Sequence, residues 1–168
     1  MDEKLKRDTK VWTVRAAAAL LAFLVLSQLI RPKTVNPAVD PAHEIGAHAE
    51  VDAATQAILE RACNDCHSSH TIWPWYSHVA PVSWLVASDV NDGRRHVNLS
   101  EWETYPVEKR GKLLDQICKE VREGDMPPFQ YMPMHRAAWL TKADRERICS
   151  WASAAKQSLV AVDGSRTP

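Results

Sequence analysis

The sequence has no net charge, no long run of alternating apolar and polar residues, and no internal repeat. Its 21 basic residues are balanced by 21 acidic ones, which argues against a strongly basic nucleic-acid-binding protein. With 25% of its residues charged, the chain is too ordinary in composition for a disordered protein. Because no alternating run is long enough to predict a strand, we expect an all-α fold. No acid–base pair or activated nucleophile stands out, so the side chains alone do not predict an enzyme.

The zero net charge is the sum of two unlike parts. Residues 1–33 hold seven Lys or Arg and three Asp or Glu, whereas residues 34–168 hold fourteen and eighteen, so +4 is set against −4. The basic part brackets an apolar run from Ala16 to Ile30, which becomes twenty residues long when it is counted from Val11. Twenty helical residues span about 30 Å, the thickness of the hydrocarbon core of a bilayer.

Residues 1–33 are therefore predicted to form an uncleaved membrane anchor. A cleaved signal peptide is the alternative, since its apolar segment has a similar length, but Val25-Leu26-Ser27 matches the small-x-small cleavage pattern poorly. More cations precede the apolar run than follow it, which predicts a cytoplasmic N-terminus. The chain after residue 33 is then expected on the outer side of the inner membrane.

The rest of the chain divides into a linker, a helical domain and a tail. Residues 34–50 show no helical or strand periodicity and include Pro37 and Pro41, so we predict a semi-extended linker. Residues 161–168 are expected to be a tail. The domain, residues 51–160, shows helical patterns over about 52–63, 81–93, 107–123 and from 141 to at least 159.

The ends of these helices have recognisable signals. Asp52 is a good N-cap for the first helix. Gly93 and Gly124 follow the second and third patterns and predict their ends. Thr141 and Asp144 approximate a capping box at the start of the last helix.

The chemistry is concentrated in CNDCHSSH, residues 63–70. Cys63-x-x-Cys66-His67 is the attachment pattern of c-type haem, in which two thiols add to the porphyrin vinyl groups and the histidine binds iron. The two residues between the cysteines match the separation of the vinyl groups along one edge of the ring. We therefore predict one covalent haem c per chain, with His67 as the proximal iron ligand.

Two other interpretations of this segment stay open. Cys63, Cys66, His67 and His70 could bind zinc, because two thiolates and two imidazoles make a tetrahedral set, although zinc fingers separate the two pairs by a longer loop. A thioredoxin-like redox pair is the second alternative, but such a pair normally begins a helix after a strand. Here a helical pattern precedes the cysteines.

From Val51 to Ala152 the sequence resembles the small haem-binding-domain family of bacterial c-type cytochromes, a branch of the cytochrome c fold. The matching stretches are ILERACNDCHSSHTIWPWYSHVAPVSWLVASDV, GRRHVNLSEW, KLLDQICKEVREGDMPP and LTKADRERICSWA. The resemblance spans about 100 of 168 residues, and WPWY and APVSW are more specific than the haem motif. The resemblance implies a cytochrome c-like helical domain around a covalent haem, preceded here by one transmembrane helix. It also implies electron transfer in the bacterial periplasm.

The distal iron ligand is predicted to be Met126. It lies in a Gly-Asp-Met-Pro-Pro loop, where the following prolines favour extended geometry, and cytochrome c relatives use a Met-Pro at the corresponding place. The alternatives are Met132, Met134, His78, His96 and His135. If none of them binds, the iron is open to small ligands, and the protein would be a haem enzyme or gas sensor.

Further residues are candidates for the haem pocket or for a disulfide. Trp73, Trp75 and Tyr76 could wall the haem edge and donate to a propionate, and Arg95, with neighbouring Arg94 and His96, could neutralise propionates. Two cysteines, Cys118 and Cys149, remain beyond the haem pair. They fit a disulfide in an oxidising compartment and a pair of buried free thiols equally well.

The predicted function is single-electron transfer by a membrane-anchored periplasmic cytochrome, with no enzymatic reaction of its own. The expected partners are the inner membrane and a redox protein that the sequence does not identify. Nucleic acid is not expected as a partner.

Overall fold

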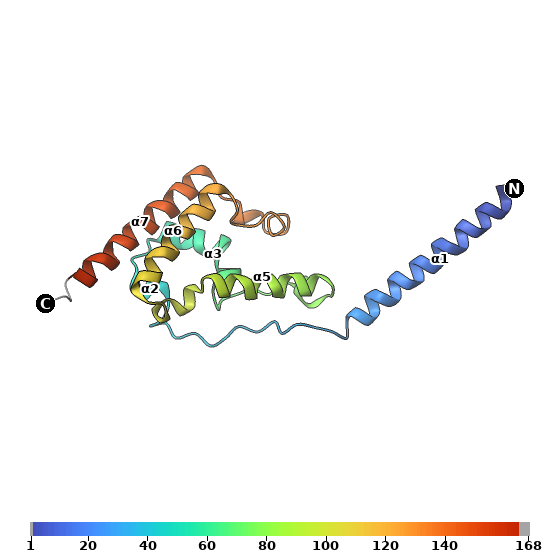
Figure 1. Ribbon diagram of the computed structural model, residues 1–168, viewed down its shortest axis with the longest axis horizontal. Coiled ribbons are helices and arrows are strands. Elements are labelled where there is room, and N and C mark those ends of the chain that lie inside the picture. Colours follow the sequence, from blue (N-terminus) through green and yellow to red (C-terminus); the bar gives the residue numbers. More distant parts are fainter. Residues whose placement is uncertain (1, 165–168) are drawn as a thin grey trace. The chain divides into compact units, whose positions relative to one another are not determined.

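The computed structural model is helical throughout its described residues, 2–164, with side chains described for residues 6–161 (Figure 1). No strand occurs in that range, which confirms the predicted helical class. The α-helices are α1 (Asp2–Ser27), α2 (Ile45–His48), α3 (Ala53–Ala62), α4 (Asn64–His67), α5 (Val82–His96), α6 (Val107–Glu123) and α7 (Lys142–Gly164). Three 3₁₀ turns lie between them, η1 (Trp75–His78), η2 (Leu99–Thr104) and η3 (Arg136–Ala138).

The described chain forms two compact units. The first contains the residues up to Val35 together with Trp73–Asp89, and the second contains Asn36–Ile72 and the chain from Val90 onward. Helix α5 begins in the first unit and ends in the second. Each unit is described by itself below.

Helix α1 belongs to the first unit and is the apolar segment predicted from the sequence. Its part from Lys6 to Ser27 is 22 residues long and apolar enough to cross a membrane. The most apolar 18 residues of this part have no buried side chain. A signal sequence has the same properties. The structure therefore shows one N-terminal apolar helix that has the length of an anchor or of a signal.

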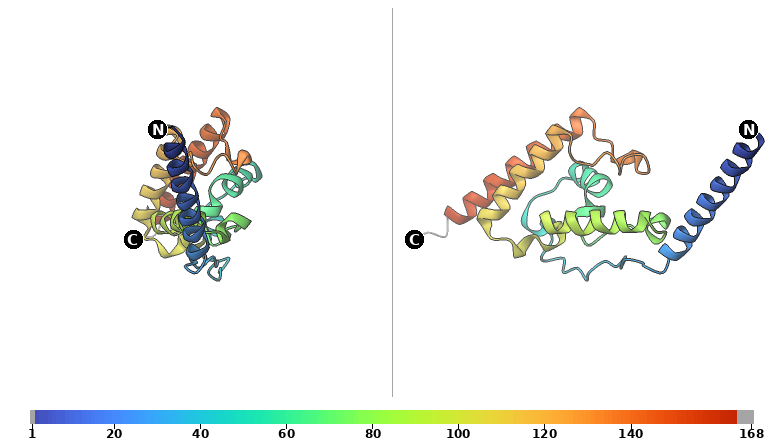
Figure 2. Two further views of the ribbon diagram at one scale, coloured as in Figure 1. Left: turned by 90° about the vertical axis from the view of Figure 1, so that its right-hand side faces the viewer. Right: turned by 45° about the vertical axis from the view of Figure 1, so that its right-hand side comes forward.

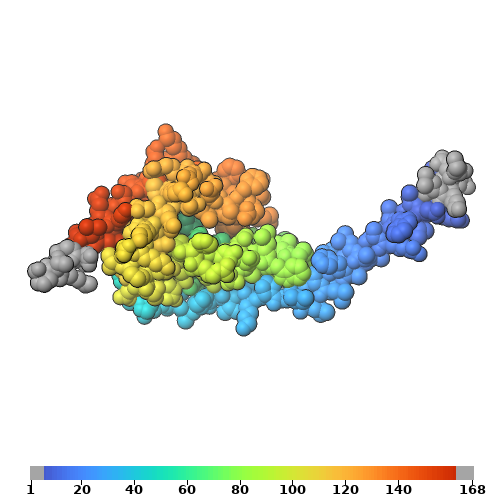
Figure 3. Space-filling view, in the orientation of Figure 1, coloured from blue at the N-terminus to red at the C-terminus, as the bar shows by residue number. Residues whose placement is uncertain are grey.

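The second unit is built around a hairpin of α6 and α7 (Figure 2). Leu114 and Val121 of α6 and Ile148 and Trp151 of α7 are all buried in its core. Burying such side chains stabilises a domain by about 1.5 to 3 kcal/mol each. Figure 3 shows the surfaces of the two helices against each other.

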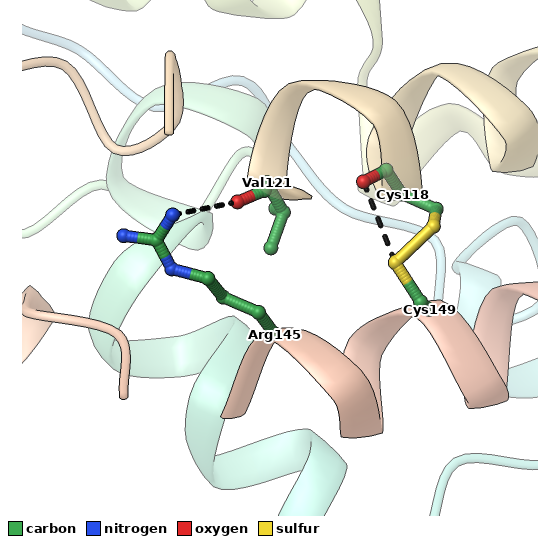
Figure 4. Close-up of a disulfide and its surroundings, with 4 residues drawn as sticks. All are labelled: Cys118, Val121, Arg145 and Cys149. Carbon is green, nitrogen blue, oxygen red and sulfur yellow. Dashed lines mark hydrogen bonds between the residues drawn. A yellow bond between two sulfur atoms is a disulfide. The ribbon is translucent and has the colours of Figure 1, made fainter. Parts of the chain in front are cut away.

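A disulfide joins the two helices of this hairpin. Cys118 and Cys149 are bonded with a Cα–Cα distance of 4.6 Å, so the structure resolves the alternatives that the sequence left open (Figure 4). One turn away, Arg145 Nη1 of α7 donates to the carbonyl oxygen of Val121 at 3.2 Å. The hairpin is thus fastened both covalently and at the last turn of α6.

Local capping rules account for three of the helix ends. The Asp52 carboxylate accepts hydrogen bonds from the backbone N–H groups of Ala54 and Thr55, and its pKa is lowered chiefly by its bond from the Thr55 hydroxyl. At the start of α7, Thr141 N donates to Asp144 and Asp144 N donates to Thr141 Oγ1, the reciprocal pattern of a capping box. These two predicted caps are confirmed.

The predicted end of the third helix is confirmed as well. Gly124 follows α6 with φ 90°, a left-handed conformation that glycine adopts without a steric penalty. Helix α7 extends to Gly164, into the segment predicted as a tail, and residues 165–168 of that tail lie outside the described residues.

Part of the predicted linker is folded into the second unit. Residues Ile45–His48 form α2, and Ile45 and Ala49, four residues apart on one side of this turn, are buried in the core. Glu44 accepts a hydrogen bond from the hydroxyl of Ser100 at 3.2 Å. Within residues 34–50, only the part before Asn36 belongs to the first unit. The rest is part of the second unit and is not the extended tether that its prolines favour.

Candidate functional site

The three residues of the haem motif lie on one short helical turn, α4, which we call the attachment turn: Cys63 is its N-cap, and Cys66 and His67 are its last two residues. Helix α3 ends at Ala62, and the carbonyl oxygen of Cys63 accepts hydrogen bonds from Cys66 N at 3.2 Å and His67 N at 2.9 Å. This turn brings both thiols and the imidazole together. Neither Cys63 nor Cys66 is in a disulfide.

The His67 imidazole is held by two backbone carbonyls of the second unit. Its Nδ1 lies 3.0 Å from the oxygen of Gly93 and 3.1 Å from that of Val97. A carbonyl can only accept, so the proton is on Nδ1 and the lone pair is on Nε2. Burial also lowers the pKa of His67, which favours the neutral ring. A neutral imidazole with a free Nε2 is the form that binds a metal.

Gly93 explains how α5 comes close enough to supply those carbonyls. A Cβ built on Gly93 would lie 2.4 Å from the carbonyl oxygen of Cys66, which is well inside van der Waals contact. The prediction that Gly93 ends the helix was wrong, because α5 continues to His96. The glycine is needed because α5 packs closely against the attachment turn. In the sequence, a glycine required for packing cannot be distinguished from one that ends a helix.

We predict that Gly93→Ala is destabilising although it removes a helical glycine. In an exposed helix the change would stabilise by about 1 kcal/mol, but the clash with Cys66 should cost about 1 to 3 kcal/mol. Urea denaturation followed by circular dichroism measures the difference. Gly111→Ala is the matched control in α6, since its Cβ would come only to 3.8 Å from the Lys156 side chain. A midpoint that rises for Gly93→Ala as much as for Gly111→Ala would refute the close approach.

The structure does not support the thioredoxin-like or the zinc-binding interpretation of this motif. Burial raises the pKa of the Cys63 thiol to about 12, whereas a thioredoxin-like nucleophile needs a lowered pKa. His70 pairs with Glu44 at 2.6 Å and is half exposed. Among the described residues no three His, Cys, Asp or Glu side chains gather in a metal-binding arrangement, so the zinc interpretation has no geometric support.

The donor set therefore fits a haem c attachment. Two thiols that are in no disulfide lie three residues apart on a turn, beside a partly buried neutral imidazole whose Nε2 carries the lone pair. In such a site Cys63 and Cys66 would hold the porphyrin and His67 would bind the iron.

The loop between α6 and α7 carries four of the six distal candidates, whereas His78 ends η1 and His96 ends α5. Met126 follows a tight turn in which Gly124 N, Asp125 N and Met126 N all approach the carbonyl oxygen of Glu120. Met126 is 36% exposed, whereas Met132 is buried and Met134 is 61% exposed. His135 stacks on Tyr131 with ring centroids 3.7 Å apart. These residues share one loop, so the structure leaves Met126 as the predicted ligand and the others as alternatives.

One hydrogen bond joins this loop to the attachment turn. The hydroxyl of Tyr131 donates to Asp65 Oδ2 at 2.7 Å, and Asp65 is one of the two residues between the haem cysteines. The other carboxylate oxygen of Asp65 accepts from Ile72 N at 2.8 Å. Neither Asp65 nor Tyr131 was predicted, because nothing in the sequence pairs two polar residues 66 positions apart.

The predicted propionate partners are placed differently from one another. Arg95 is 71% exposed and pairs with Asp92. Arg94 is the residue that is built into the site: its guanidinium donates to Ser68 O at 2.8 Å and to Thr71 Oγ1 at 2.9 Å. It also reaches Asn36, and burial lowers its pKa. Arg94 thus fastens the segment that follows the haem motif.

The predicted aromatic pocket residues belong to the first unit. Trp73 precedes η1, and Trp75 and Tyr76 begin it. Trp75 is 72% exposed and meets the Tyr76 ring edge-on, with centroids 5.7 Å apart. His78, another distal candidate, ends η1 in the same unit. Their predicted approach to haem stays a prediction.

Comparison with known proteins agrees with this site. The model of the haem-binding domain family matches residues 22–154, a longer span than the resemblance between Val51 and Ala152. No curated protein and no solved structure matched the chain. The matched span includes the end of α1, the linker, the attachment turn and the α6–α7 hairpin. The chain belongs to the haem-binding domain family.

Proposed function

We propose that the protein is a membrane-anchored monohaem c-type cytochrome that carries single electrons. The observation that carries this proposal is the His67 imidazole, which is partly buried, has a lowered pKa and is turned by two carbonyls so that Nε2 keeps its lone pair. Thioether bonds to Cys63 and Cys66 would fix the porphyrin beside it. When bound, the haem supplies a one-electron couple, and no acid–base side chain is needed for that reaction.

The chain's own residues would set the properties of this couple. The carbonyls of Gly93 and Val97 keep the His67 ring in one orientation and make it a better donor. A Met126 thioether on the opposite side would favour the reduced state and raise the potential. The Tyr131–Asp65 hydrogen bond would hold the Met126 loop against the attachment turn.

The proposed location is the bacterial inner membrane, with the haem domain in the periplasm. Helix α1 has the length and apolarity of a single span, and the excess of cations before it favours a cytoplasmic N-terminus. The Cys118–Cys149 disulfide supports an oxidising compartment for the domain. Electrons would pass between a membrane complex and a second redox protein.

A haem enzyme or gas sensor is the second candidate, and the position of Met126 favours it. Met126 lies in the loop between α6 and α7, outside both helices, and this loop is tied to the attachment turn by the Tyr131–Asp65 hydrogen bond. A weakly bound thioether would let carbon monoxide reach the ferrous iron. Spectra of the ferrous protein with and without carbon monoxide separate the candidates, because a tightly bound methionine leaves the spectrum almost unchanged.

We predict that Met126→Ala abolishes the thioether-to-iron charge-transfer band and lowers the reduction potential. The reason is that a soft sulfur ligand, which favours ferrous iron, is lost. Optical spectroscopy of the oxidised protein and a redox titration measure the two effects. Met134→Ala is the control, since Met134 lies in the same loop and is more exposed. A band that survives Met126→Ala would assign the ligand to another residue.

A further inference from the structure

An uncharged segment of the first unit contains the predicted pocket residues Trp73, Trp75 and Tyr76, but a haem contact of these three would not account for its composition. Residues 73–88, WPWYSHVAPVSWLVAS, contain no Asp, Glu, Lys or Arg. The segment includes η1 and the first half of α5. A surface segment of a water-soluble domain normally carries charged side chains, so its composition needs an explanation.

The exposed side of this segment is more apolar than its buried side. Val79, Val82 and Leu85 follow at intervals of three and are 43%, 46% and 52% exposed. On the other side of α5, the small residues Ser83 and Ala87 are buried. An amphipathic helix in water has the opposite arrangement. With Trp75, which is 72% exposed, these three residues form what we call the juxtamembrane face.

This face is tied to the end of the apolar helix α1. The Gln28 side chain donates to Ala80 O at 2.9 Å and accepts from Ala80 N at 3.1 Å. Trp84 Nε1 donates to the carbonyl oxygen of Ile30 at 2.7 Å. These bonds connect residues more than 50 positions apart within one unit. Where α1 leaves a membrane, the juxtamembrane face is therefore held close to the membrane surface.

We infer that the juxtamembrane face rests in the headgroup region of the lipid bilayer. This inference rests on the anchor in the proposed function. Tryptophan is enriched at membrane interfaces, because its ring is apolar and its N–H is polar, and Val79, Val82 and Leu85 bury apolar area in the adjoining acyl region. Arg31 and Lys33, both exposed just after α1, suit anionic headgroups. A lipid surface, continuous with the span, accounts for an exposed apolar face without charges.

Photolabelling by lipids tests this inference on the full-length, haem-loaded protein. The protein is reconstituted in vesicles of phosphatidylethanolamine and phosphatidylglycerol that contain a lipid with a diazirine near the glycerol, and labelled peptides are mapped by mass spectrometry. We expect labels in residues 73–86. The peptides with Phe129 and Trp139 are reference peptides, because these side chains are 82% and 59% exposed and belong to the other unit, so their labels report exposed apolar side chains outside the juxtamembrane face.

A double variant sharpens the test. Val82→Ser/Leu85→Ser should reduce labelling of residues 73–86 about tenfold, which corresponds to 1.4 kcal/mol of lost partitioning. Val107→Ser/Phe129→Ser replaces two exposed apolar residues of the other unit and should leave this labelling unchanged. The haem spectrum of each variant verifies that the domain is intact.

The pattern of labels separates the inference from the proposed function. Labels in α1 but not in residues 73–86 would overturn the juxtamembrane face while the anchor stands, and would favour a protein partner for this surface. Labels in neither segment would show that the anchor itself is wrong, and the inference would fall with it. A haem spectrum that changes in Val82→Ser/Leu85→Ser, with labelling unchanged, would assign the face to the haem pocket instead.

Discussion

A Cys63→Ala/Cys66→Ala variant is expected to lose all covalently attached haem. Neither thiol is in a disulfide, and both lie on one turn beside His67, so they are the groups that would form the two thioether bonds. Without these bonds any remaining haem is held only by its iron ligands and by packing, and it dissociates when the chain is denatured. Haem staining of a denaturing gel, with the intact mass of the chain, measures the loss.

The matched control for this prediction is Cys118→Ala/Cys149→Ala. It removes the same number of cysteines but only the disulfide of the α6–α7 hairpin, so haem staining should persist. Staining that survives in Cys63→Ala/Cys66→Ala would contradict covalent attachment at this motif. Staining that disappears in both variants would show instead that the haem is lost whenever the domain is weakened.

The turn that carries the Cys-x-x-Cys-His motif and the helix ends were the most predictable features of the chain. Asp52, Gly124 and the Thr141–Asp144 pair act on backbone groups within four residues of themselves, so local sequence contains the whole interaction. The Cys-x-x-Cys-His spacing is equally local, because its turn is closed by bonds to a single carbonyl, that of Cys63. Interactions of this range can be predicted from one sequence.

The surroundings of the haem motif could not be predicted in the same way. Gly93 resembles a helix stop, but its role is set by the Cys66 carbonyl oxygen, which approaches from another helix. Likewise Arg94 and Arg95 are identical in type and adjacent. Only the fold decides that Arg94 reaches Ser68 and Thr71 while Arg95 pairs with Asp92. Such choices depend on which face of α5 meets the attachment turn.

The linker illustrates a second limit of sequence periodicity. Residues 34–50 hold too few apolar residues for a helical pattern, yet Ile45 and Ala49 are buried in the core. A single turn needs only these two side chains, and two residues define no period. The family match from residue 22 onward agrees with a folded unit that begins before the predicted domain boundary at residue 51.

Replacing both disulfide cysteines, Cys118→Ser/Cys149→Ser, should lower the unfolding free energy by about 3 to 4 kcal/mol. The bond joins residues 31 positions apart, and opening it returns the entropy of that loop to the unfolded chain. For a domain of this size the thermal midpoint should fall by roughly 10 to 20 °C. Circular dichroism during thermal denaturation, with the unfolding free energy from urea titration, measures both quantities.

The reduced wild-type protein is the control for this variant. If the disulfide acts through the unfolded chain, adding a thiol reductant should lower the wild-type midpoint to that of Cys118→Ser/Cys149→Ser and leave the variant unchanged. Both helices keep their buried contacts through Leu114 and Ile148, and the His67 bonds to Gly93 and Val97 do not involve the hairpin. The haem spectrum at 25 °C should therefore be the same in all four samples. A midpoint insensitive to reductant would mean that the mature protein contains two free thiols, and the argument for an oxidising compartment would lose its structural support.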